Sequence, residues 1–270
     1  MKLQSKTRIG AVSYLNTKPL IESLEDRCEK IELSLDLPSR LATQLARGEL
    51  DVALIPSVET FRMRGAKILS DACIGCRGPV WSVKLLSRKP FEEIRTLSLD
   101  EGSRTSVGLA KVLLRKRYGL CPVVSSLPID QEPETSSSDA ILVIGDRAMH
   151  IETEKFPHQW DLGEQWCRWT GLPFVFAMWV TLADQPDPEL IQALGDARDY
   201  GISRIDEIAR REAKRYDLSV ESCCRYLREN LHFCIGESER KAIELYQAYL
   251  FELNLIPESR ELNFYECQTS

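Results

Sequence analysis

Short clusters of hydroxyl and amide side chains follow several predicted strands of this chain. The clusters are Ser13–Thr17, Ser57, Ser82 and Ser103–Ser106. Ligands of open α/β sheets bind beyond the carboxyl ends of strands, often against a helix N-terminus with unpaired N–H groups. Neutral donors placed there suit a small anion, and fixed donors also stabilise negative charge that develops during a reaction. The alternative for each cluster is an ordinary capped turn at the start of a helix.

The first cluster lies in the string VSYLNTKPL at residues 12–20. An apolar, β-prone run ends at Val12, and Pro19 favours the start of a helix soon afterwards. The donors between these two points predict an anion site at a strand-to-helix turn. They belong to Ser13, Tyr14, Asn16 and Thr17.

Two later segments have the same character. Ser103, Thr105 and Ser106 open a strongly predicted helix, where a hydroxyl would either face a ligand or cap the helix. Gly145 and Asp146 follow a fully apolar predicted strand. Glycine there permits close approach of the backbone to a ligand, and the aspartate would orient a partner or only close the turn.

The sequence shows no cluster of residues suited to acid–base catalysis or metal binding. The three histidines do not have paired spacing, and no Ser/His/Asp or Cys/His arrangement is indicated. Cys73 and Cys76 form a CxxC without a second such pair, so buried thiols are favoured over a zinc or redox site. A GxGxxG after the first strand and a P-loop are both missing, so we expect no cofactor and no metal.

Composition excludes further classes. The 270 residues carry a formal net charge of −6, which disfavours nucleic acid and anionic membranes as partners. The N-terminus has no apolar signal-peptide core. The longest apolar stretch, at residues 174–183, is about half of the ~20 residues that span a bilayer. We therefore expect a cytoplasmic protein with a small-molecule partner, and the oligomeric state stays open.

Apolar periodicity predicts the elements that position these residues. Strands are expected at 8–12, 31–37, 52–55, 66–69, 80–86, 95–99, 140–144 and 174–182, with another beginning at Val123. Helices are expected at 18–24, 39–47, 58–63, 103–118 and 161–170, and from Asp187 onward we expect helices only, the last two at 219–233 and 238–255. This order predicts an α/β fold with mainly parallel sheets.

The string at residues 12–20 resembles the signature of the chorismate dehydratase family of menaquinone biosynthesis. The resemblance extends over almost the whole chain through residues that are individually less specific. They are Pro38, Leu41, Leu45, Gly48, Asp51–Ser57, Ser82, Val83, Leu85, Ser103–Ser106, Ile144–Asp146, Asp161–Gly163, Trp166 and Gly171–Phe174. The sister branch, which makes dihydroxynaphthoate, has a related fold but a different opening motif.

The resemblance implies a two-lobed α/β fold of the periplasmic-binding-protein type II class, with mixed or parallel sheets and a helical C-terminal segment. One lobe would contain residues 1–86 and 178–270, the inserted lobe residues 87–177, and the ligand would bind between them. The implied reaction removes water from chorismate to give 3-[(1-carboxyvinyl)oxy]benzoate in the futalosine pathway. The alternatives are a non-catalytic small-anion binding or sensor protein of the same fold, and a member of the related dihydroxynaphthoate synthase branch.

In that cleft we expect Asn16 and Ser82 to act in the reaction. Asn16 would orient the substrate or the leaving hydroxyl, and Ser82 would hold a carboxylate. No side chain stands out as the base, so the substrate's own enolpyruvyl carboxylate is a reasonable candidate. The expected substrate-binding residues are Ser13, Tyr14, Thr17, Ser57, Ser103, Thr105, Ser106, Gly145 and Asp146.

Overall fold

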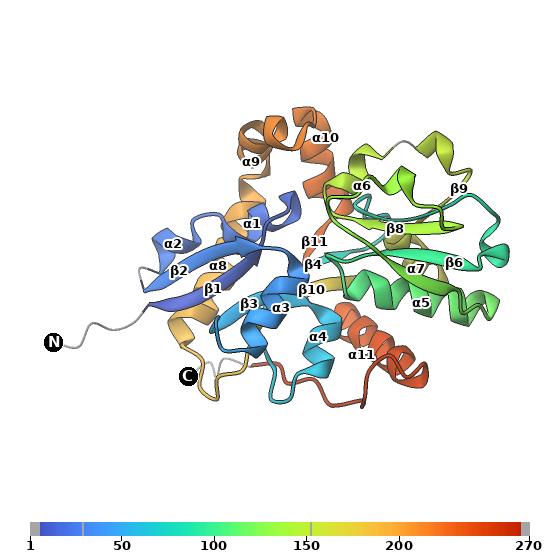
Figure 1. The fold of residues 1–270 in the computed structure, drawn as a ribbon. Coiled ribbons are helices and arrows are strands. Elements are labelled where there is room, and N and C mark those ends of the chain that lie inside the picture. Colours follow the sequence, from blue (N-terminus) through green and yellow to red (C-terminus); the bar gives the residue numbers. More distant parts are fainter. Residues whose placement is uncertain (1–5, 29, 152, 266–270) are drawn as a thin grey trace.

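The described part of the chain folds around two mixed β-sheets that lie side by side (Figure 1). The computed structural model describes residues 6–28, 30–151 and 153–265. The first sheet has the order β11-β4-β10-β3-β1-β2, with β1 Thr7–Val12, β2 Ile31–Asp36, β3 Val52–Pro56, β4 Lys67–Cys76, β10 Phe174–Thr181 and β11 His232–Cys234. The second has the order β7-β6-β8-β5-β9, with β5 Val83–Ser87, β6 Thr96–Asp100, β7 Val123–Leu127, β8 Ala140–Ile144 and β9 His158–Asp161.

Helices pack against both sheets (Figure 1). Beside the first sheet, α3 contacts β1 and β3, α4 contacts β3, and α8 contacts β4, whereas α5 and α7 pack on the second sheet. The bounds are α1 Lys18–Ile21, α2 Leu24–Arg27, α3 Pro38–Ala46, α4 Ser57–Arg62, α5 Thr105–Tyr118, α6 Arg147–His150, α7 Leu162–Thr170, α8 Pro188–Ser203, α9 Ile205–Glu212, α10 Val220–Arg225 and α11 Glu237–Glu252.

Strand direction differs from the sequence-based expectation. β1 pairs in parallel with β2 and β3, and β6 pairs in parallel with β7 and β8. The partners of β10, β4 and β5 are all antiparallel. The expectation of mainly parallel sheets is wrong, because the apolar run of a buried strand does not encode its direction.

Several element boundaries also need correction. The helix expected at 18–24 is broken into α1 and α2, because Ser23 between them adopts a left-handed conformation with φ 60°. The strand expected at 66–69 continues to Cys76 as β4. The helices-only prediction after Asp187 is wrong, because β11 adds a short strand beside β4. β9 was also not predicted, since its four residues carry no clear alternation.

The chain passes from the first sheet to the second after β4 and returns before β10. β5 begins at Val83 and belongs to the second sheet, and β10 begins at Phe174 and belongs to the first. The strands therefore change sheets a few residues before the expected lobe boundaries at 86 and 177. The division into two lobes stays a prediction, with each sheet as the centre of one lobe.

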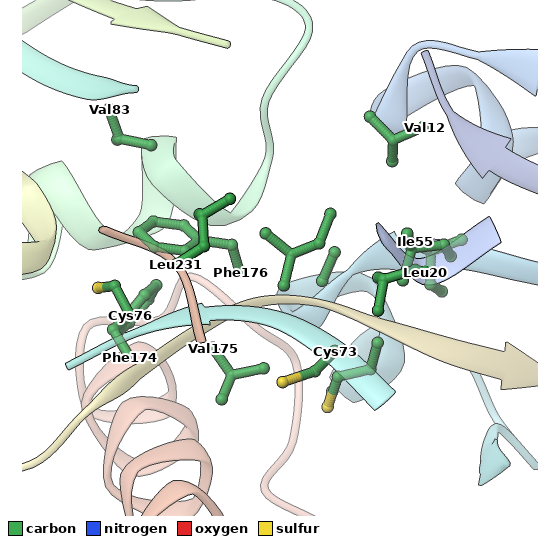
Figure 2. Packing of buried hydrophobic residues seen from close by; sticks show 14 of the residues in the cluster. Val12, Leu20, Ile55, Cys73, Cys76, Val83, Phe174, Val175, Phe176 and Leu231 are labelled. Carbon is green, nitrogen blue, oxygen red and sulfur yellow. The ribbon is translucent and has the colours of Figure 1, made fainter. Parts of the chain in front are cut away.

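The chain leaves the first sheet after β4 and re-enters it at β10, and these two strands lie side by side in a buried apolar region (Figure 2). Phe174, Phe176 and Cys76 belong to the core that extends between the sheets. Cys73 and Cys76 are both fully buried thiols, as the sequence predicts, and burial raises the pKa of Cys73. This packing joins the two sheets without any crosslink among the described cysteines.

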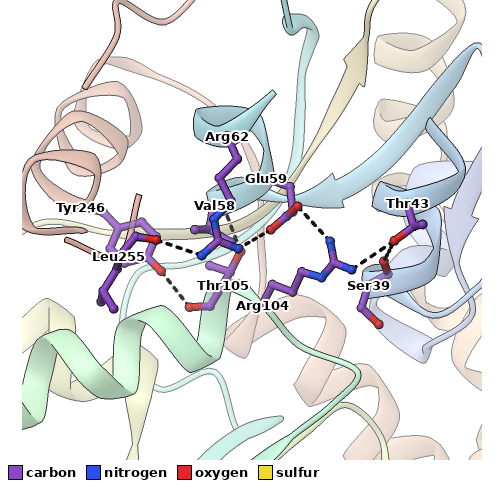
Figure 3. A network of polar contacts seen from close by, with 9 residues as sticks. All are labelled: Ser39, Thr43, Val58, Glu59, Arg62, Arg104, Thr105, Tyr246 and Leu255. Carbon is purple, nitrogen blue, oxygen red and sulfur yellow. Dashed lines mark hydrogen bonds and ion pairs between the residues drawn. The ribbon is translucent and has the colours of Figure 1, made fainter. Parts of the chain in front are cut away.

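A second connection between the sheets is polar (Figure 3). Glu59 on α4 is 7% exposed and forms ion pairs with Arg62 at 2.7 Å and with Arg104 at 2.9 Å. Arg104 precedes α5 and also donates to Thr43 Oγ1 on α3 at 3.1 Å. This network connects the start of α5 to helices that pack on the first sheet.

Asp146 makes a third connection. Its Oδ1 accepts a hydrogen bond from the backbone N–H of Leu15 at 3.2 Å, which ties the loop after β8 to the segment after β1. Burial raises the pKa of Asp146 to about 6, against the lowering effect of the Leu15 hydrogen bond and nearby cations. The folded state therefore holds a proton on Asp146 at pH values where the unfolded chain has already lost it.

The Asp146→Asn variant should remove this pH dependence. For the wild type, the free energy of unfolding falls as pH rises from about 4 to about 6, because Asp146 loses its proton at higher pH in the folded state. Relative to wild type, Asp146→Asn should gain about 2 kcal/mol between pH 4.5 and 7. Urea unfolding at both pH values measures this gain.

Asp139→Asn is the matched control. Hydrogen bonds from Lys89 and backbone amides lower the pKa of Asp139 to about 2, so its contribution is already complete at pH 4.5. Its stability difference from wild type should stay constant between pH 4.5 and 7. An equally constant difference for Asp146→Asn would contradict the raised pKa.

Candidate functional site

A pocket lies between the two sheets, at the strand ends where the sequence places its donor clusters. Its wall includes the ends of β1, β3 and β8, the start of β5 and the first turn of α5. The lining residues are Val12, Tyr14, Asn16, Pro38, Pro56, Ile74, Val80, Ser82, Val83, Ser103, Thr105, Ser106, Ile144, Gly145, Phe176 and Ala177. The apolar members could contact a ring, and the polar members could hold its substituents.

Seven of the expected site residues line this pocket, although they come from four separate segments of the chain. They are Tyr14, Asn16, Ser82, Ser103, Thr105, Ser106 and Gly145. The structure thus brings together residues as far apart as Tyr14 and Gly145. Their roles toward a ligand stay predictions.

The other four expected residues do not line the pocket. Ser57 Oγ donates to the carbonyl of Val175 and joins α4 to β10. The Ser13 carbonyl accepts from the Tyr216 hydroxyl at 3.3 Å. Thr17 is buried beside Asn16, and Asp146 accepts from Leu15 as described above. The side chains of Ser57, Thr17 and Asp146 are thus used within the protein, whereas Ser13 contributes its backbone carbonyl to such a contact.

Asn16 lies in a single 3-10 turn, Leu15–Thr17, between β1 and α1. The Thr17 hydroxyl donates to Asn16 Oδ1 at 3.3 Å, so the amide can present its N–H groups to the pocket. α1 has only four residues and no side-chain cap. A helix this short does not support the anion site expected at its N-terminus. The donor that this segment offers to the pocket is the side chain of Asn16.

The N-terminus of α5 is a better donor site, because this helix has 14 residues. Ser103 Oγ accepts from the Ser106 N–H at 3.1 Å and acts as a cap. Thr105 Oγ1 accepts from the Val58 N–H at 3.3 Å (Figure 3). Both hydroxyls accept in these bonds, so each keeps its own hydrogen for a ligand.

Tyr14 crosses from the first sheet to the loops of the second. A Cβ on Gly145 would lie 2.9 Å from Tyr14 Cζ, and a Cβ on Gly102 would lie 3.1 Å from the Tyr14 hydroxyl oxygen. Gly145 also has φ +68°, a conformation that disfavours any other residue. Glycine is required at position 145 both by the backbone and by the tyrosine ring.

The two loops behind Tyr14 are fixed by a partly buried ion pair that the sequence did not suggest. Asp100, at the end of β6, accepts from Arg147 at 2.7 Å, from Gly102 N at 2.9 Å and from Ile144 N at 3.2 Å. Burial raises the pKa of Asp100, and Arg147 opposes that shift. The rule that ligands lie beyond strand ends could have identified Asp100, since it directly follows the strand predicted at 95–99.

Ser82 lies at the end of a tight turn that connects β4 to β5. The carboxylate of Asp161 accepts from Val80 N at 2.9 Å and from Trp81 N at 2.6 Å. These bonds explain why β5 begins at Val83 and not at Val80 as expected. The hydroxyl of Tyr226 donates to Ser82 Oγ at 2.8 Å. Tyr226 falls in the helix predicted at 219–233, and no local pattern distinguishes it there.

The pocket wall is nearly free of ionisable groups. Among the lining residues, Tyr14 is the only one with a titratable side chain, and burial raises its pKa further. In the described part of the chain, no group of three His, Cys, Asp or Glu side chains is arranged to hold a metal ion. No described helix is long and apolar enough to cross a membrane. The pocket therefore offers neutral hydrogen-bond donors to a ligand.

Curated relatives resemble the chain over most of its length. A chorismate dehydratase from Thermus thermophilus is 30% identical over 256 residues, covering 88% of this chain and 93% of the relative. A chorismate dehydratase from Campylobacter jejuni is 26% identical over 252 residues, covering 91% of this chain and 98% of the relative.

Solved structures share the fold. A protein from Archaeoglobus fulgidus superposes with a TM-score of 0.70 at 15% identity, covering 95% of this chain and all of that one. The periplasmic aliphatic sulphonate binding protein of Escherichia coli superposes with a TM-score of 0.61 at 14% identity, covering 98% of both chains. The expected periplasmic-binding-protein-like α/β fold is confirmed.

A family model described as menaquinone biosynthesis matches residues 7–252. This range includes all the strands of both sheets and all the lining residues of the pocket. The chain belongs to the menaquinone biosynthesis family.

Proposed function

We propose that this protein is a chorismate dehydratase, which removes water from chorismate to give 3-[(1-carboxyvinyl)oxy]benzoate. The observation that carries this proposal is the pocket of neutral donors between the sheets, lined by Asn16, Ser82, Thr105 and Ser106. Two curated relatives with this activity in their names support it. The reaction makes the protein a carbon–oxygen lyase, and its partner is the small-molecule substrate.

The substrate's chemistry matches such donors. Chorismate carries two carboxylates, and the proton that is lost sits on the ring carbon that bears the enol ether. Negative charge left on that carbon spreads through a ring double bond onto the ring carboxylate. Donors fixed around this carboxylate stabilise the charge as it develops. The product ring is aromatic, so the enzyme's main task is positioning.

The donors divide into two groups in this proposal. The hydroxyls of Ser82, Thr105 and Ser106 hold carboxylates, assisted by N–H groups at the start of α5. Asn16 orients the substrate or the departing hydroxyl. A neutral amide is a poor base, and the ionisable group on the wall, Tyr14, has a raised pKa. The enolpyruvyl carboxylate of the substrate is therefore the proposed base.

Turnover of chorismate tests the proposal directly. Purified protein mixed with chorismate should form an aromatic product, followed by its ultraviolet absorbance and identified by mass. Binding of chorismate without any turnover would contradict the proposal and would indicate a binding protein of the same fold.

Asn16→Ala should abolish turnover while chorismate binding stays detectable by calorimetry. The physical reason is that the amide contacts the reacting region, whereas the carboxylates keep their donors on Ser82 and α5. Gln192→Ala is the matched control, because Gln192 is an exposed amide on α8 that hydrogen-bonds Asp196. Full activity of Asn16→Ala would exclude a role for Asn16 in the reaction.

Gly145→Ala should reduce kcat/KM by at least about ten-fold, because the new methyl group displaces the Tyr14 ring from the pocket wall. Gly119→Ala provides the control. Gly119 has a similar φ of +71°, but nothing lies within 4 Å of its added Cβ. Gly119→Ala should lose about 1–2 kcal/mol of stability because its backbone is left-handed, and Gly145→Ala should lose more because of the added contact with Tyr14. Equal steady-state kinetics for the two variants would contradict a role for the Tyr14–Gly145 contact.

A further inference from the structure

The turn that carries Ser82 is held by a segment from near the C-terminus. Tyr226 is fully buried and donates to Ser82 Oγ, and its ring packs edge-on against Trp81 with centroids 5.6 Å apart. Asn230 Nδ2 donates to the carbonyl of Pro79 at 2.9 Å. Three of the four residues from Pro79 to Ser82 are thus contacted by one five-residue segment, Tyr226–Asn230.

That segment and the turn both have unusual backbones. Tyr226–Asn230 forms a π-helix, a rare form that often occurs at functional sites. Trp81 has φ +62°, which is a strained conformation for a bulky residue. The Asp161 carboxylate stabilises this conformation through the N–H groups of Val80 and Trp81. The strained residue, Trp81, thus lies immediately before Ser82, which lines the pocket.

The hydrogen bonds of Ser82 leave one group free for a ligand. A serine hydroxyl has one hydrogen to donate and two lone pairs that accept. Tyr226 occupies an acceptor position at 2.8 Å, whereas the one acceptor for the Ser82 hydrogen among the described residues is the Val80 carbonyl at 3.4 Å, a long contact. A carboxylate entering the pocket would be a better acceptor for that hydrogen.

Tyr226 is suited to remain the donor of this pair. Burial raises its pKa, so the phenol keeps its proton throughout the physiological range. Hydrogen bonds with Ser82 and with Asn16 lower that pKa only in part. The phenol therefore contacts both residues assigned to the reaction.

We propose that Tyr226 is a positioning residue that orients Ser82, so that the serine hydroxyl donates its hydrogen to a substrate carboxylate. This inference rests on the proposed function, because it concerns the same pocket and the same substrate. Tyr226 itself does not line the pocket, so it acts through Ser82.

A double-mutant cycle tests the inference. Wild type, Ser82→Ala, Tyr226→Phe and the double variant are compared for chorismate turnover. Tyr226→Phe should lower kcat about ten-fold with a much smaller change in KM, the loss expected for one oriented hydrogen bond. The double variant should lose much less activity than the product of the two single losses, because Ser82→Ala removes the hydroxyl that Tyr226 orients and leaves Tyr226 only its contact with Asn16. If turnover of the double variant is undetectable, the same cycle is measured on the Kd of the product.

Tyr246→Phe is the matched control for removal of a buried hydroxyl. Tyr246 is also buried, but its hydroxyl donates to the Thr105 carbonyl at 2.8 Å and does not contact Ser82. Its effect should add to that of Ser82→Ala, and thermal melts should show that all variants are folded.

The outcomes separate the two proposals. A wild-type protein that does not turn over chorismate overturns the proposed function, and the inference about Tyr226 with it. An active wild type with additive effects of Tyr226→Phe and Ser82→Ala overturns only the inference. An active wild type with unchanged kcat in Tyr226→Phe also overturns the inference alone.

Discussion

The carboxylate of Asp161 fixes the point at which the chain passes from one sheet to the other. It accepts from Val80 and Trp81 and also from the N–H of Glu164, where it caps α7. Burial raises the pKa of Asp161, and its three backbone hydrogen bonds oppose that shift. One half-buried side chain thus joins the end of β9, the start of α7 and the turn before β5. The position of Ser82 on the pocket wall depends on this turn.

The charged side chains near the pocket lie behind its wall, where they pair with one another. Asp100 and Arg147 pair beneath the loops of the second sheet, and Glu59 pairs with Arg104 beside the start of α5 (Figure 3). These pairs order the loops while the wall itself presents hydroxyl, amide and backbone groups. Such a wall can orient a dianionic substrate through hydrogen bonds. A strong ion pair would stabilise the bound substrate as much as the transition state and would not speed the reaction. This arrangement fits a reaction in which charge moves within the substrate.

Local sequence patterns predicted much of the fold. The apolar run of Ala140–Ile144 predicted β8 with both ends correct, and the stripe and final glycine of α5 predicted its C-terminal end. Sequence patterns did not predict the features of the fold that depend on tertiary contacts. The start of β5 is set by Asp161, nearly 80 residues later in the sequence, and β11 is a strand because it pairs with β4.

By itself, the sequence determined that neutral donors follow strand ends, because a strand-to-helix turn needs such residues and a buried strand needs an apolar run. Seven of those donor or glycine positions line one pocket. Only the tertiary structure decided which donors face that pocket and which are used internally, as Ser57 is by the Val175 carbonyl. It alone brought Tyr226 to Ser82, since a hydrogen bond between residues 144 positions apart leaves no local pattern in either segment.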